Sequence, residues 1–378
     1  MGFNQNKLLG TLLLALAQFA SATTWYVNGA TGKDTNNCLS PTSACKTIGH
    51  AISLASSGDS ITVAAATYKE NLTIGISLSV IGAGARTTII DGGGVKRVVS
   101  ISSGNVTLAG LTIRHGFAPY GYGGVGAGIF NSGNLLVITS TITGNLASVT
   151  CPARSSSCSA AGGGIYNSNA AKLTISQSTV AFNSVQASCP INPCVAGADG
   201  GGVFNRGTLT MSNSTLEGNT ARHIGVFGYD HGGGIDNIGT AMISSSTVSG
   251  NFAGGGISTN VGFSVTLQNS IVSNNSGSNC SGTMISKGYN LSSDSTCNFT
   301  GPGDMNNIDP NLGPLQNNGG PTDTMALLPG SPAIDAGNPS GCTDGQANLL
   351  KTDQRGMPRS DREDTGGCDI GAYESQTD

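Results

Sequence analysis

One pattern recurs five times between Gly126 and Asn275, and it limits the possible folds more than any other feature of the chain. Each copy begins with a glycine run, continues through short runs rich in Ile, Val and Thr, and ends in asparagine. Equivalent glycines lie 36, 38, 32 and 22 residues apart; they are Gly128, Gly164, Gly202, Gly234 and Gly256. A repeat of this length predicts a solenoid, because a single copy cannot bury its apolar face without its neighbours.

The residues within each copy indicate strands. Apolar and polar residues alternate with a period of two, as in residues 173–175 and 178–180, and no helical period appears. The shortest interval, 22 residues, fits one turn of a parallel β-helix, and the longer intervals are that turn plus an insertion. We therefore predict an all-β chain that winds as a right-handed parallel β-helix of roughly nine or ten coils.

Five asparagines stand at the same place in the five copies, each of them five residues after a serine. The pairs are Ser140 and Asn145, Ser178 and Asn183, Ser214 and Asn219, Ser246 and Asn251, and Ser270 and Asn275. Stacked coils would place these side chains about 4.8 Å apart, within reach of amide–amide hydrogen bonds. We also expect the asparagines to occupy the left-handed backbone region at a tight corner.

Composition and the N-terminal residues limit the classes of protein to which the chain can belong. The chain has 378 residues and a net charge of −4, which provides no basic surface for nucleic acid. Residues 1–22 read as a secretory signal, with Lys7, an apolar run over residues 8–17 and a small-residue site ending at Ala22. That run is too short to span a membrane, and no later stretch is long enough. We expect a secreted or surface-exposed monomer that begins at Thr23.

Ten cysteines in an exported protein predict disulfides. They fall into five close pairs: Cys38 and Cys45, Cys151 and Cys158, Cys189 and Cys194, Cys280 and Cys297, and Cys342 and Cys368. Pairing between nearest neighbours leaves no cysteine over, although the sequence alone does not fix the connectivity. Zinc is the alternative, and the irregular spacings without accompanying histidines argue against it.

We expect three parts after the signal: an N-terminal cap over residues 23–57, the β-helix over 58–299 and a C-terminal cap over 300–378. Trp25 lies in a first strand, and residues 45–56 have the spacing of a helix that covers the first coil. Asp335 and Asp369 suit turn caps or a structural Ca²⁺ site, and no other cofactor is expected. The charged tail is predicted to be an ion-pair network; it comprises Asp353, Arg355, Arg359, Asp361, Arg362, Glu363 and Asp364.

Two stretches resemble known families. The glycine-rich repeats resemble those of polymorphic outer-membrane proteins and of pectate-lyase-like right-handed β-helices. Residues 309–322, 327–337, 353–359 and 368–374 are similar to the choice-of-anchor Q domain, a resemblance that covers roughly residues 300–374. It implies a secreted bacterial β-helix protein that ends in this domain.

Three insertions interrupt the repeat at the same point, over residues 146–161, 184–199 and 220–231. We expect them to form loops on one edge of the solenoid, where binding surfaces usually lie. Strand alternation predicts a column of outward side chains beside them: Phe130, Tyr166, Phe204 and Asp236. The aromatic members either stack on sugar rings or are buried under the loops.

The third insertion supplies candidate catalytic residues: Arg222, Asp230 and His231, close to Asp236 and one coil from Asp199. Such a set suits glycoside hydrolysis, or Ca²⁺ binding with arginine as base. No polygalacturonase or pectate lyase motif is present, so polar groups on a solvated loop are the simpler interpretation. We therefore predict an adhesive or structural protein whose lateral loops bind a glycan or another surface, with a lyase or hydrolase of an acidic polysaccharide as the alternative. A structural envelope protein without a ligand is the third possibility.

Overall fold

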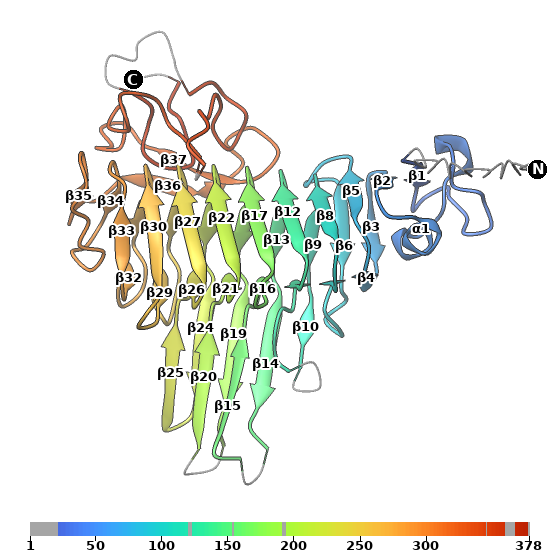
Figure 1. Cartoon of the computed structure of the whole chain (residues 1–378), viewed down its shortest axis with the longest axis horizontal. Helices are drawn as coiled ribbons and strands as arrows, with labels where there is room; N and C mark the ends of the chain where they lie inside the picture. The colour runs from blue at the N-terminus through green and yellow to red at the C-terminus, as the bar shows by residue number, and fades with distance from the viewer. Residues whose placement is uncertain are drawn as a thin grey trace, which may run out of the picture.

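The computed structural model describes residues 22–119, 123–152, 155–190, 194–344, 346–359 and 367–376 (Figure 1). Nearly all of the predicted signal and the charged residues Asp361–Asp364 lie outside these ranges. Within them, no helix is long and apolar enough to cross a membrane.

Three long parallel sheets run along the body (Figure 1). Sheet A comprises β1 (Thr24–Val27), β2 (Ser60–Val63), β5 (Leu78–Gly82), β8 (Asn105–Ala109), β12 (Asn134–Ile138), β17 (Lys172–Ser176), β22 (Thr208–Ser212), β27 (Thr240–Ser244), β30 (Ser264–Gln268) and β33 (Met284–Ser286). Sheet B comprises β3 (Ala66–Lys69), β6 (Thr88–Asp91), β9 (Thr112–Arg114), β13 (Thr141–Thr143), β18 (Thr179–Ala181), β23 (Thr215–Glu217), β28 (Thr247–Ser249), β31 (Ile271–Ser273), β34 (Leu291–Ser292) and β35 (Met305–Asn306). Sheet C comprises β4 (Leu72–Ile74), β7 (Val99–Ile101), β11 (Ile129–Asn131), β16 (Ile165–Asn167), β21 (Val203–Asn205), β26 (Ile235–Asn237), β29 (Ile257–Thr259) and β32 (Cys280–Ser281).

Each coil contributes one strand to each sheet in turn, so the chain is a parallel β-helix, as predicted. Crossover connections between parallel strands are right-handed in nearly all proteins, which is the reason for the predicted right-handed winding. Inward positions stack the same class of side chain from coil to coil; one such column contains Val137, Ile175, Met211, Ile243 and Leu267, all fully buried. Each coil therefore buries its apolar face only against its neighbours.

The predicted asparagine column is present inside the corner that follows sheet B. Each side-chain amide donates to the next amide oxygen; the distances are 2.8 Å (Asn145 to Asn183), 3.0 Å (Asn183 to Asn219), 3.0 Å (Asn219 to Asn251) and 2.9 Å (Asn251 to Asn275). The expected left-handed backbone falls one residue earlier, at Gly144, Phe182, Gly218, Gly250 and Asn274. The turn at that preceding residue lets the asparagine side chain point inward, where the ladder forms.

A second asparagine ladder, which we did not predict, is formed by the last residues of four sheet C strands. The amides of Asn131, Asn167, Asn205 and Asn237 are linked by hydrogen bonds of 2.8, 2.7 and 2.6 Å. The predicted serines also form a column, in which the backbone N–H of one coil donates to the serine hydroxyl of the next, as from Ser178 to Ser214 at 3.2 Å. Buried polar groups at the corners are thus satisfied by the neighbouring coil.

The N-terminal cap agrees with the prediction. Trp25 lies in β1, and helix α1 (Ile48–Leu54) follows the short 3-10 helix η1 (Pro41–Ser43). The helix begins after its N-cap Thr47, and the carboxylate of Glu70 accepts hydrogen bonds from the first N–H groups, those of Ile48 and Gly49. Figure 1 places α1 at the N-terminal end of the solenoid.

The three insertions are strands and not the loops we expected. They form a wing that projects from the body and consists of two sheets, each built of parallel strands (Figure 1). Sheet D comprises β10 (Phe117–Ala118), β14 (Leu146–Thr150), β19 (Ser184–Ser188) and β24 (Thr220–Ile224), and sheet E comprises β15 (Ser157–Ala161), β20 (Val195–Asp199) and β25 (Phe227–His231). A small core of buried alanines, valines and cysteines holds the two sheets together, because small side chains allow close sheet packing.

All five nearest-neighbour disulfides are present: Cys38–Cys45, Cys151–Cys158, Cys189–Cys194, Cys280–Cys297 and Cys342–Cys368. Two of them, Cys151–Cys158 and Cys189–Cys194, join the outgoing and returning strands of the wing. The prediction of disulfides over zinc is therefore confirmed.

The C-terminal segment lies along the flank of sheet B, whereas we expected it to wrap the last coil. It contains one antiparallel hairpin, β36 (Leu312–Gln316) and β37 (Thr324–Leu327). The buried Gln354 side chain accepts from the Thr215 hydroxyl at 2.7 Å and donates to the Thr179 hydroxyl at 3.0 Å, so it joins two coils of the body. In Figure 1 this segment sits on the side of the body opposite the wing.

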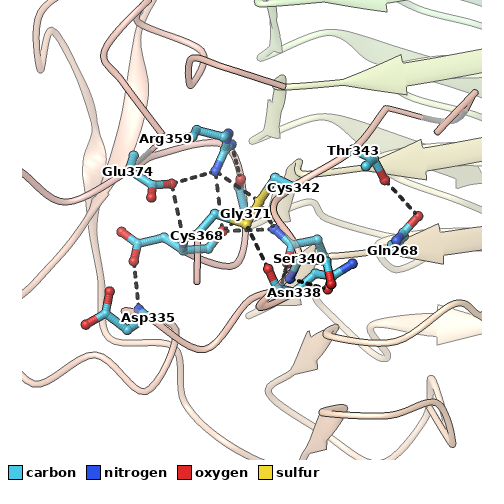
Figure 2. The surroundings of a disulfide bond; sticks show 12 residues. Gln268, Asp335, Asn338, Ser340, Cys342, Thr343, Arg359, Cys368, Gly371 and Glu374 are labelled. Atoms are coloured by element: carbon cyan, nitrogen blue, oxygen red, sulfur yellow. Dashed lines mark hydrogen bonds and ion pairs between the residues drawn. A yellow bond between two sulfur atoms is a disulfide. The ribbon is translucent and has the colours of Figure 1, made fainter. Parts of the chain in front are cut away.

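The described part of the charged tail forms the predicted ion pairs. Asp353 pairs with Arg355 at 2.8 Å, and Arg359 pairs with Glu374 at 2.8 Å, all four side chains being almost fully buried. Figure 2 shows Arg359 and Glu374 pointing toward one another beside the Cys342–Cys368 disulfide.

Asp369 has the predicted role at a turn. Its carboxylate accepts hydrogen bonds from the backbone N–H groups of Asp335, at 2.8 Å, and Ser375. The structural Ca²⁺ site suggested for Asp335 and Asp369 remains a prediction.

The asparagine ladder yields a stability prediction. Asn219 makes four hydrogen bonds with neighbouring coils, and Asn219→Ala leaves their partners buried without replacements. We expect the free energy of unfolding to fall by about 3 kcal/mol, measured by denaturant titration with circular dichroism. Asn134→Ala, which removes a comparable but exposed bond to Asn105, is expected to cost less than about 0.5 kcal/mol. Equal losses in the two variants would contradict the role of burial.

Candidate functional site

The candidate site lies where the wing returns to the body. Strands β20 and β25 end at Asp199 and His231, and a glycine run then turns the chain into sheet C. Gly232 has φ 55°, and a side chain there would collide with the carbonyl of Ile235. This sharp turn brings His231 beside Asp236, four residues after the glycine.

The predicted outward column is present in sheet C, where Phe130, Tyr166, Phe204 and Asp236 are paired in register. Phe130 and Tyr166 stack with centroids 5.3 Å apart and ring planes 7° apart, and Tyr166 stacks on Phe204 at 5.3 Å. The guanidinium of Arg97 lies 4.6 Å from the centroid of Phe130. Phe204 is buried, whereas Phe130 and Tyr166 are half-buried. The stacked rings therefore cover part of one another's faces.

Asp199, His231 and Asp236 form a compact cluster at the end of this column. One potential ligand atom from each lies within 4.8 Å of the other two, and Oδ1 of Asp199 is 3.3 Å from Nδ1 of His231. Asp236 is only 1% exposed, and its Oδ1 has no hydrogen-bond partner among the described residues. The same holds for Oδ1 of Asp199, whose contact with His231 has an ion-pair distance but lacks the alignment of a hydrogen bond. Two carboxylates are therefore buried together with too few hydrogen bonds to offset the free-energy cost of removing them from water.

Electrostatics at the cluster favour bound protons. Burial and repulsion from the Asp199 carboxylate raise the pKa of Asp236 to about 7, although His231 lowers it. Contact with the Asp199 carboxylate raises the pKa of His231, against the opposite effect of burial. Both shifts favour the protonated form of the group concerned.

Tyr229 covers the exposed side of the cluster. Its ring stacks on His231 with centroids 4.8 Å apart, and the tyrosine is 43% exposed. Gly197 lies directly beneath, and a side chain there would collide with the Tyr229 ring. Tyr229 falls within residues 220–231, which we expected to form a loop, and its alignment with His231 depends on β25 being a strand.

The structure separates the other two candidates from the cluster. Asp230 faces the opposite side of β25 and accepts from Nδ1 of His223 at 2.9 Å, inside the wing. Arg222 is exposed in β24, on the other wing sheet, and no ion pair of Arg222 is found among the described residues. The predicted arrangement of Asp230, His231, Asp236 and Arg222 is thus reduced to His231 and Asp236, with Asp199 added.

A polar cluster that we did not predict lies on the opposite flank of the wing, near a cleft of about 650 Å³. There Oδ2 of Asp91 accepts from Arg114 at 2.9 Å and lies 3.0 Å from Nδ1 of His115. Lys69, Asp91 and Arg114 occupy equivalent positions at the ends of β3, β6 and β9. The three charged residues are present in the sequence, but their alignment becomes visible only once the register of the coils is known.

Comparisons with known proteins find structural similarity alone. No family model matches the chain, and no curated protein matches it. The solved structure of pectate lyase Pel9A aligns with TM-score 0.47 and 14% identity over 94% of this chain and 97% of that one. A pectin methylesterase mutant in complex with a hexasaccharide aligns with TM-score 0.26 and 15% identity, over 65% of this chain and 80% of that one. The pectin methylesterase PemA from Erwinia chrysanthemi gives 0.26 and 16%, over 72% and 71%. Similarities at this level carry no argument about activity.

The raised pKa of Asp236 predicts a pH-dependent stability. Between about pH 4 and about pH 7 the folded chain holds a proton that the unfolded chain has released, so stability falls as pH rises, by at most about 1.4 kcal/mol per pH unit. Asp236→Asn removes this effect. In buffer with a chelator, we expect its melting temperature to exceed that of the wild type by more at pH 8 than at pH 4.

Thermal melts followed by circular dichroism at both pH values provide the measurement. The exposed variant Asp309→Asn controls for the general loss of one negative charge. The same Asp236→Asn difference at pH 4 and pH 8 would contradict the assignment of a raised pKa.

Proposed function

We propose that the protein is a secreted or cell-surface β-helix that binds a polysaccharide where the wing meets sheet C. The proposed contact area, here called the junction surface, consists of Phe130, Tyr166, Arg206, Tyr229 and His231. Tyr229 and Arg206 are exposed there, and Phe130 and Tyr166 are half-buried. Amphipathic rings with a polar edge beside an arginine provide both apolar contact and hydrogen bonds, which a hydrated sugar chain requires.

The observation that carries the proposal is that the aromatic rings of the junction surface are partly exposed while the carboxylate of Asp236 is buried. Glycoside hydrolysis requires an acid and a second carboxylate that reach the scissile bond, and Asp236 is only 1% exposed. Binding requires only the exposed edges and polar groups. The geometry therefore supports adhesion better than cleavage.

Arginine placement indicates the kind of sugar. Nη1 of the exposed Arg206 is 3.4 Å from the Tyr166 hydroxyl, so its guanidinium flanks the aromatic column. The guanidinium of Arg97, over Phe130, already donates to the carbonyls of Val125 and Gly126. Guanidinium groups recognise carboxylates in two-point geometry. An acidic polysaccharide fits this surface better than a neutral one.

The location follows from the chemistry of the chain. Five disulfides among the described residues are consistent with an oxidising compartment. The predicted signal over residues 1–22 agrees with secretion.

A glycan array with the purified chain from residue 23 onward tests the proposal. We expect binding to acidic polysaccharides, and a loss of at least about tenfold in affinity for Tyr166→Ala combined with Tyr229→Ala. Phe182→Ala is the matched control, because Phe182 is an exposed ring on the opposite flank of the wing, where sheet B leads into sheet D.

A depolymerisation assay on the same polysaccharides separates binding from cleavage. We expect no product. Product formation that Asp236→Asn abolishes would contradict the adhesive proposal and make the protein an enzyme. Absence of both binding and product would also contradict it, and would favour a structural protein without a glycan ligand.

A further inference from the structure

We propose that Asp199, His231 and Asp236 bind a divalent first-row transition metal ion, with Zn²⁺ as the best-fitting member of the class. The three side chains come from β20, β25 and β26, which the chain brings together at the turn from the wing into sheet C. The proposal is independent of polysaccharide binding at the junction surface.

The first argument is charge. Asp199 and Asp236 place two carboxylates in a buried space, and Oδ1 of each lacks a hydrogen-bond partner among the described residues. Carboxylates buried without partners are costly, and a divalent cation between them removes that cost. Asp236 is 1% exposed, offers a carboxylate oxygen to the cluster and has an Oδ1 without a hydrogen-bond partner among the described residues, which is an observation beyond the mere proximity of acidic groups.

The second argument is geometry. The three potential ligand atoms lie within 4.8 Å of one another. Tetrahedral zinc with bonds of about 2.0–2.2 Å to nitrogen and oxygen ligands places two ligand atoms about 3.3–3.6 Å apart. Oδ1 of Asp199 and Nδ1 of His231 already lie 3.3 Å apart, and a contraction of at most about 1.5 Å brings the other distances to tetrahedral spacing.

The third argument is the donor set, which selects the class of metal. Two carboxylates alone would suit Ca²⁺ or Mg²⁺, which take oxygen ligands in larger numbers. An imidazole among only three protein ligands suits Zn²⁺ and its neighbours in the first transition row. Tyr229 stacks on the His231 ring and fixes its plane, which is the role of a supporting residue at a metal site.

Isothermal titration of ZnCl₂ into tag-free, chelator-stripped protein at neutral pH is the direct test. We expect saturable binding of one ion per chain, and at least about a tenfold loss of affinity in Asp236→Asn and in His231→Gln. His223→Gln is the matched control, because His223 sits in the neighbouring strand, pairs with Asp230 and is expected to leave affinity unchanged.

Two further measurements make the outcome decisive. Circular dichroism melts establish that each variant is folded, and Co²⁺ should give a visible ligand-field spectrum that Asp236→Asn removes. Absence of saturable binding, or equal Zn²⁺ affinity in wild type and both cluster variants, would overturn the proposal. Tighter binding of Ca²⁺ than of Zn²⁺ would overturn the assignment of the metal class.

Discussion

In-register stacking of coils is the constraint on which the rest of this structure depends. Every coil must satisfy its buried polar corners, and five successive coils do so with an asparagine at the same point. Asn183, for example, accepts from the backbone and amide of Asn145 and donates onward to Asn219. Such a ladder forbids slippage, since a shift of one residue would unpair every rung and turn apolar side chains outward.

The ladder also explains where the wing can grow. All three insertions begin immediately after a ladder asparagine, so each departs from a corner that the neighbouring coils already hold. Because the departures are aligned, the inserted strands pair with one another as the body strands do. The same alignment returns them together to sheet C. Asp199 and His231 therefore lie beside Asp236. The junction surface and the buried cluster both result from this repeated geometry.

The sequence predicted much of the fold because the signals were repeated. Five agreeing positions for glycine, serine and asparagine defined the coil, and the close cysteine pairs anticipated every disulfide. It did not predict the wing strands. Residues 157–161, Ser-Cys-Ser-Ala-Ala, have little intrinsic strand preference and become a strand through pairing with residues 195–199. The place of the C-terminal segment depended likewise on tertiary contacts, such as that of Gln354 with Thr215.

The candidate site was predictable in composition but not in arrangement. Strand alternation correctly aligned Phe130, Tyr166, Phe204 and Asp236, since that rule is local. Alternation within the unrecognised strand β25 decides that His231 faces the cluster while Asp230 faces the wing interior. The burial of Asp236 depends on the turn at Gly232, which no local pattern reveals.

Hydrogen exchange followed by mass spectrometry tests the central claim, that stacked asparagine corners hold the molecule together. Peptides covering residues 141–147, 179–185, 215–221 and 247–253 contain the ladder corners, and the wing tip at 224–228 provides an internal reference. The account predicts that the corner amides exchange only through global unfolding, much more slowly than those of the wing tip. Corner peptides that exchange as fast as the wing tip would contradict it.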